Sequence, residues 1–271
     1  MRSPYITQGH AELLAGRLSD RDRAILVDLA RVRVLTARQL DRLHFADLAP
    51  GSRERSRRRV MARLVEHRLV ATLERTVGGA RSGSAGYVFG LDVAAQRVLP
   101  LVGGAECASP PSGRTRAPDT PGTLFLAHAL DVSGLFVALK ERERAGDLTL
   151  AQYAVESAAW HPDERGGLLK PDAYVRIRHG GIEDSWWVEV DRATESLPTL
   201  KRKLRSYVDF VTQGNYGPDG VLPRVLVTVP HDRRLAGVRT VVNDLPAPAG
   251  ELISSSLYDQ AAPLMIDTLR A

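Results

Sequence analysis

Cysteine is almost absent from this chain, which has one, Cys107, in 271 residues. A single cysteine cannot form an intrachain disulfide, and no Cys/His cluster has the spacing of a zinc site. These absences exclude a disulfide-stapled scaffold and a zinc finger. They also indicate a reducing compartment, so we expect a cytoplasmic protein.

Long apolar runs are also missing. The most apolar helix candidate, residues 124–139, is shorter than the roughly 20 residues that span a bilayer, and it contains His128 and Asp131. No apolar stretch follows Arg2, so we expect neither a signal peptide nor a membrane partner.

Lysine is scarce, and the charge is unevenly spread. Residues 1–102 contain 18 arginines, no lysine and 10 acidic residues, a net charge of +8. The remainder contains 19 basic and 22 acidic residues, a net charge of −3. A basic part followed by an acidic part predicts two domains with different functions.

The boundary between the two domains is predicted from composition. Residues 103–122 read GGAECASPPSGRTRAPDTPG, which is dense in glycine and proline and has no apolar periodicity. This composition is typical of a linker. We therefore expect domains at residues 1–102 and 123–271.

The first domain is predicted to be a winged helix-turn-helix. Apolar residues recur at helical spacing after three candidate caps, Ser19 or Asp20, Thr36 and Ser52, which predicts three helices. Two strands, residues 69–77 and 87–91, then enclose a glycine-rich tip. Three helices followed by a hairpin is the element order of a winged helix.

The third helix carries the argument for DNA binding. Its first half, SRERSRRR, places arginines where a recognition helix meets DNA. Arginine suits both phosphate contacts and guanine contacts in the major groove. The candidate contacts to double-stranded DNA are Arg53, Arg55, Arg57, Arg58 and Arg59, with Arg81 in the wing. The alternative is a basic but idle helix in a protein-interaction module.

The second domain is predicted to combine helices with a mixed sheet, which makes the whole chain α+β. The expected order is helix 124–145, strands 148–156, 170–178 and 185–191, helix 197–211 and strand 224–229. Hairpins make part of this sheet antiparallel, and the last crossover adds a parallel strand.

Three carboxylates gather at one end of the predicted hairpin. Asp172 opens one strand, while Glu189 and Asp191, two residues apart, share a face at the end of the next. Such a cluster needs a neutralising cation, and Mg²⁺ or Mn²⁺ prefers oxygen ligands. The alternative is a solvated strand end, with Glu189 paired to Lys170 or an arginine.

The pattern Pro171-Asp172 followed by Glu189-x-Asp191 resembles the PD-(D/E)XK nuclease fold. The resemblance implies that Asp172 and Glu189 bind a divalent metal and that a lysine stands two residues after the glutamate. Here that position holds Asp191, which favours a catalytically degenerate domain. Lys201 and Lys203, on the following helix, are the candidates to replace the missing lysine.

Over residues 18–230 the chain more specifically resembles the replication-relaxation family of plasmid and mobile-element proteins. The residues that carry the resemblance are Ala127-His128-Ala129, Lys170-Pro171-Asp172, Glu189-Val190-Asp191, Lys203-Leu204 and Tyr207, beside the winged helix. The resemblance implies DNA-linked work in plasmid replication or transfer. The alternatives are a Mg²⁺- or Mn²⁺-dependent endonuclease or nickase, and a winged helix transcriptional regulator.

Other residues and partners stay open at this stage. His128 is either a core residue or a neighbour of the metal site. Trp160, Trp186 and Trp187 pack the sheet or, alternatively, stack on nucleobases. A homodimer and other replication or transfer proteins are further candidate partners.

Overall fold

The computed structural model describes residues 6–73, 87–103 and 123–271. The chain divides into two compact units, Met1–Ser133 and Gly134–Ala271, and the division falls inside helix α6 (Thr123–Arg144). The predicted wing tip with Arg81 and nearly all of the predicted linker lie outside the described residues. Each unit is described by itself below.

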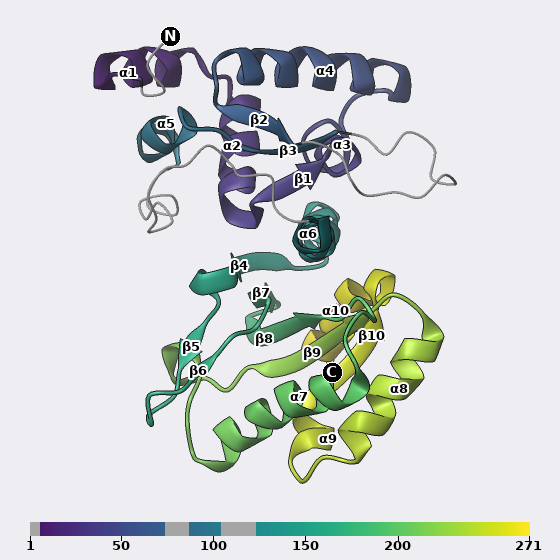
Figure 1. The fold of residues 1–271 in the computed structure, drawn as a ribbon. Coiled ribbons are helices and arrows are strands. Elements are labelled where there is room, and N and C mark those ends of the chain that lie inside the picture. Colours follow the sequence, from purple (N-terminus) through teal and green to yellow (C-terminus); the bar gives the residue numbers. More distant parts are fainter. Residues whose placement is uncertain (1–5, 74–86, 104–122) are drawn as a thin grey trace. The chain divides into compact units, whose positions relative to one another are not determined.

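The first unit combines helices with a small antiparallel sheet (Figure 1). Its elements before α6 are α1 (Gln8–Arg17), α2 (Asp20–Val32), β1 (Val34–Thr36), α3 (Ala37–His44), α4 (Pro50–Glu66), β2 (Val70–Leu73), β3 (Val88–Leu91) and α5 (Ala95–Val102). The strands pair in the order β1-β3-β2. The three predicted helices and two predicted strands are present, whereas α1, β1 and α5 were not expected.

Local capping explains where the helices of this unit begin. Ser19 and Asp22 form a capping box at α2, and Thr36 and Gln39 form a second one at α3. Helix α4 begins at Pro50, earlier than the predicted cap at Ser52. Proline suits the first helical turn because its fixed φ is already helical and its missing N–H would have no partner there.

The first half of α6 belongs to the core of the first unit. Leu126 packs with Val34, Leu73 and Val88 in one buried cluster. The Ser133 hydroxyl donates a hydrogen bond of 2.8 Å to the Val34 carbonyl. These contacts hold the edge strand β1 against a helix that lies far away in the sequence.

The second unit contains a mixed five-stranded sheet in the order β10-β9-β8-β7-β4. After α6, its main elements are β4 (Thr149–Val155), β5 (His161–Pro162), β6 (Leu168–Leu169), β7 (Ala173–His179), β8 (Ile182–Val190), α7 (Leu197–Thr212), β9 (Arg224–Val229), α8 (Asp232–Asn243), α9 (Ala249–Leu252), β10 (Ile253–Leu257) and α10 (Ala261–Arg270). Strands β4, β7 and β8 pair antiparallel, and β8, β9 and β10 pair parallel. The α+β class and the mixed sheet are therefore confirmed.

Helices cover both faces of this sheet (Figure 1). Trp187 of β8 packs with Leu204 of α7 and Val238 of α8 in the larger buried cluster. Helix α10 packs on β7, β8 and β10. Because β8 is buried on both faces, its sequence WWVEV is continuously buried rather than alternating, and Glu189 lies inside this interior strand.

None of the helices in the described part of the chain is long and apolar enough to cross a bilayer.

Candidate functional site

Two of the predicted carboxylates meet where β7 begins and β8 ends. Asp172 immediately precedes β7, and its backbone N–H donates to the Val188 carbonyl at 3.0 Å. Its Oδ2 atom accepts a hydrogen bond of 2.7 Å from the Val190 N–H. This backbone bonding fixes the Asp172 side chain beside Glu189, as the predicted hairpin requires.

Helix α7 supplies a lysine and a tyrosine to the same place. Lys203 and Tyr207 are four residues apart and therefore lie on one face of the helix. The Lys203 ammonium forms an ion pair with Glu189 Oε2 and lies 3.8 Å from Asp172 Oδ1. The Tyr207 hydroxyl donates to Glu189 Oε1 at 2.5 Å. We call Asp172, Glu189, Lys203 and Tyr207 the acid–lysine cluster.

Burial dominates the electrostatics of this cluster. Glu189 is 2% exposed, and desolvation followed by the charge of Asp172 raises its pKa to about 8, although Lys203 and Tyr207 oppose the shift. Burial alone would lower the pKa of Lys203, but the carboxylates of Glu189 and Asp172 raise it above its ordinary value. Burial, and then Glu189, raise the pKa of Tyr207. Lys203 therefore stays an ammonium group at neutral pH.

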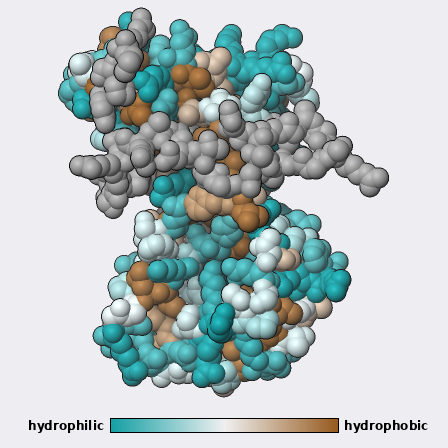
Figure 2. Space-filling model, viewed as in Figure 1, coloured by the Kyte–Doolittle hydropathy of each residue, from teal (hydrophilic) through white to brown (hydrophobic). Residues whose placement is uncertain are grey.

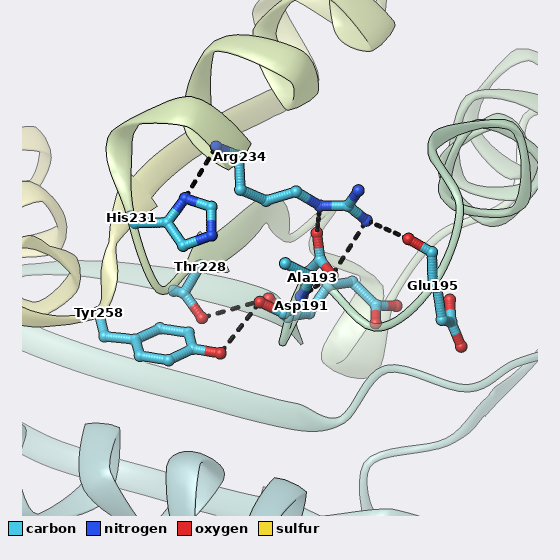
Figure 3. A network of polar contacts seen from close by, with 8 residues as sticks. Asp191, Ala193, Glu195, Thr228, His231, Arg234 and Tyr258 are labelled. Carbon is cyan, nitrogen blue, oxygen red and sulfur yellow. Dashed lines mark hydrogen bonds and ion pairs between the residues drawn. The ribbon is translucent and has the colours of Figure 1, made fainter. Parts of the chain in front are cut away.

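The third predicted carboxylate has a different partner. Asp191 accepts hydrogen bonds from Arg234 Nε at 2.5 Å and from the Ala193 N–H at 2.8 Å (Figure 3). Arg234 also donates to the Glu195 carbonyl, and the Tyr258 hydroxyl donates to the Asp191 carbonyl. Asp191 thus ties the loop after β8 to α8 and to the segment after β10.

This pairing changes the expected metal site. Asp191 follows Glu189 by two residues, which is why both were expected to bind one metal ion. In the structure, however, Arg234 neutralises the Asp191 carboxylate. Within residues 6–73, 87–103 and 123–271, no group of three His, Cys, Asp or Glu side chains is placed to hold a metal ion. No local signal points to Arg234, because this partner of Asp191 lies on a helix 43 residues later.

Two other candidates have surroundings of their own. Lys201 pairs with Asp244 at 3.2 Å, so only Lys203 points back to the carboxylates. His128 is half-buried in the part of α6 that belongs to the first unit. Tyr207, which sequence reasoning assigned only to the apolar face of its helix and to the family run, is a direct partner of Glu189.

The five arginines between residues 53 and 59 of α4 divide into two groups. Arg53 donates to the carbonyls of Phe45, Ala46 and Leu48, and so holds the turn between α3 and α4. Arg57 is 8% exposed and bonds Asp41 Oδ1 at 2.9 Å. These two arginines, expected on the DNA face, are engaged inside the unit instead.

The other three of these arginines lie on the outer face of α4, whereas Arg63, nearer the end of the helix, donates to the buried Asp22 of α2. Arg55, Arg58 and Arg59 are exposed, and Arg58 pairs with Glu54 one turn away. Figure 2 shows hydrophilic colouring over α4 on the outside of the first unit. This face is the basic surface that α4 presents to solvent.

The fold and the acid–lysine cluster together define the class of protein. The chain is an α+β protein with a helical, basic first unit and an acid–lysine cluster on the mixed sheet of the second. The model of the replication-relaxation family matches residues 26–225, and the chain belongs to this family. Membership suggests a role in plasmid or mobile-element replication or relaxation. A search of curated proteins gave no match.

Proposed function

We propose that the protein binds double-stranded DNA through α4 and works in plasmid or mobile-element replication or transfer. The observation that carries the proposal is the set of exposed arginines near the start of this helix. In this proposal the first unit is a winged helix, α4 is its recognition helix, and β2 with β3 form the base of its wing.

The element order supports this proposal. The sequence α2, β1, α3, α4, β2, β3 with the sheet order β1-β3-β2 is that of a winged helix. Arg53 and Arg57 fix α4 to the turn before it and to α3, so the outer arginines are presented on a rigid support. A firmly held helix loses little entropy when it enters a groove.

Duplex binding tests the proposal. The double variant Arg55→Ala/Arg59→Ala should bind duplex DNA about tenfold more weakly or worse, because each arginine contributes phosphate or base contacts. A matched control removes the same charge from exposed positions on other helices of the unit, Arg17→Ala/Arg97→Ala. Equal affinities of the two variants in a fluorescence-anisotropy titration would refute a role for α4.

A second function, metal-dependent cleavage of phosphodiester bonds, is favoured by the position of Lys203. Helix α6, strands β4, β7 and β8, helix α7 and strand β9 follow the αβββαβ order of PD-(D/E)XK nucleases, with β5 and β6 inserted. Lys203 contacts both carboxylates, which is what a replacement for the motif lysine needs. Asp191 therefore does not by itself argue for a degenerate domain.

The donor set suits a divalent ion. Mg²⁺ is often held by one or two carboxylates together with water and substrate phosphate. Asp172 and Glu189 would hold Mg²⁺ or Mn²⁺, since both contact one cation already. A bound ion would polarise a phosphoryl oxygen and activate water. Lys203 would neutralise the charge that develops on the phosphate, and Tyr207 would keep Glu189 oriented.

Plasmid cleavage tests this second function. With Mg²⁺ or Mn²⁺, the wild type should convert supercoiled plasmid to nicked or linear DNA. Glu189→Gln and Lys203→Met should each lower the rate about a hundredfold or more. Lys201→Met is the control that should cleave normally, because Lys201 pairs with Asp244. Absence of cleavage by the wild type with both ions would leave DNA binding as the only function.

A further inference from the structure

An exposed tryptophan lies on the segment that leads to Asp172. Trp160, just before β5, is 40% exposed, whereas Trp186 and Trp187 in β8 are completely buried. Two of the three predicted sheet-packing tryptophans therefore pack the sheet, and Trp160 lies at the surface. A partly exposed indole offers an apolar face on which a ligand can pack.

The segment around Trp160 is firmly anchored. The His161 ring lies 6.0 Å from the Trp187 ring and 5.9 Å from the Phe210 ring. A ring nitrogen of His161 also hydrogen-bonds the Tyr216 carbonyl at 2.9 Å, and Tyr216 itself is 67% exposed. The exposed indole of Trp160 is thus adjacent to His161, which packs in the core. The segment of Tyr216, which has an exposed aromatic ring, lies next to it.

A cation completes this surface. The Lys170 ammonium lies 4.9 Å from the centre of the Trp160 ring. Lys170 is exposed and stands two residues before Asp172, with the buried Pro171 between them. An indole and an ammonium group therefore lie on the chain segment that enters the acid–lysine cluster.

We propose that Trp160 and Lys170 bind an unpaired nucleotide of a DNA strand beside the acid–lysine cluster. The base stacks on the indole, and its phosphate contacts the ammonium group. In a duplex both faces of each base are covered by its neighbours, so this site selects single-stranded or locally opened DNA. This inference rests on the proposed function, because it takes DNA as the ligand. It adds that the second unit binds DNA in its single-stranded form.

An aromatic ring paired with a cation favours nucleic acid over an apolar protein surface. A protein partner would cover Trp160 with apolar side chains and would leave the Lys170 ammonium desolvated without a counter-charge. A nucleotide satisfies both groups, because it carries a π face and an anionic phosphate.

The chain's own fluorescence tests the proposal. Since Trp186 and Trp187 are buried, Trp160 is the tryptophan that an added ligand reaches. A mixed-sequence single-stranded oligonucleotide, added to the full chain with a metal chelator, should quench this emission. The duplex of the same sequence should quench it much less. Quenching that persists in Trp160→Leu would overturn the proposal.

Affinities give the second readout. Trp160→Leu should weaken single-strand binding about five- to a hundredfold, the usual range for loss of one stacked base, and Lys170→Met should weaken it less. Trp160→Phe keeps an aromatic face and should stay within about threefold of wild type. The matched control is Ile182→Ala, which removes an exposed apolar side chain at the β7–β8 turn. Equal single-strand affinity of wild type and Trp160→Leu would overturn the proposal.

The two proposals fail separately. The variant Arg55→Ala/Arg59→Ala should keep the quenching of Trp160 by single strands even though it loses duplex affinity. Duplex binding without single-strand quenching would overturn the Trp160 site and leave the α4 proposal standing. Single-strand quenching together with unchanged duplex affinity in Arg55→Ala/Arg59→Ala would overturn the α4 proposal and leave the Trp160 site standing.

Discussion

The position of Glu189 in the fold changes the pKa of its carboxyl group. Its carboxyl group is buried in β8 between a second carboxylate, an ammonium group and a phenol. Burial raises its pKa to about 8, whereas an unfolded glutamate has a pKa near its ordinary value of 4.5. The folded protein therefore holds this proton more tightly than the unfolded chain does.

This difference predicts a pH-dependent stability. The proton on Glu189 stabilises the fold fully below about pH 4.5, and this stabilisation is lost as pH rises towards about 8. Glu189→Gln cannot ionise, so its stability relative to wild type should increase over that window by on the order of a few kcal/mol. Urea unfolding with a metal chelator, followed by the emission of the buried Trp186 and Trp187, measures this difference for the second unit.

A control separates Glu189 from general charge effects. Glu251 lies exposed in α9 of the same unit, so Glu251→Gln should follow the wild-type pH dependence. Parallel stability curves for wild type and Glu189→Gln between about pH 5 and pH 9 would show that the buried carboxyl group is not the source.

At the scale of elements, α4 carries two tasks on one arginine-rich sequence. Arg57 faces inward and pairs with Asp41, while Arg59 faces solvent. Arg57→Ala should cost about 2 kcal/mol of stability, because it leaves Asp41 partly buried without its partner. Arg59→Ala should change stability by less than about 0.5 kcal/mol.

Urea unfolding followed by circular dichroism, with the two variants side by side, measures the division of tasks in α4. The expected pattern is an early loss of helix in Arg57→Ala and a wild-type curve in Arg59→Ala. Equal losses in both variants would contradict the assignment of Arg57 to the interior.

The elements that sequence predicts well are those whose signals are local. Capping residues and apolar spacing predicted α2, α3 and α7, and alternation predicted β7. Strand β10 reads ISSSL and has little apolar signal, because its pairing with β9 rather than its side chains makes it a strand. Elements of this kind depend on partners far away in the chain.

In the candidate site, too, contacts between residues far apart in the chain could not be predicted from local signals. Strand parity and the hairpin placed Asp172 beside Glu189, but helical phase does not choose between Lys201 and Lys203, since both border the buried face of α7. The partner of Asp191 was beyond such reasoning, because Arg234 comes from α8 after a complete further strand. Likewise, which arginines of α4 turn inward depends on Asp41 and on the turn carbonyls.

At the scale of the whole molecule, the two units differ in charge as well as in fold. The strongly basic residues 1–102 suit a polyanion, and the slightly acidic remainder contains the acid–lysine cluster. We therefore expect the first unit to bind duplex DNA, with the exposed face of α4 on its phosphates, and the second unit to contact single strands.

The salt dependence of duplex affinity measures the phosphate contacts of α4. Each phosphate contact releases a counterion and steepens the slope of log affinity against log salt by about 0.9. Arg55→Ala/Arg59→Ala should therefore give a slope shallower by about two, with weaker binding throughout. The control Arg17→Ala/Arg97→Ala should keep the wild-type slope. The same slope for wild type and both variants would show that α4 does not contact DNA phosphates.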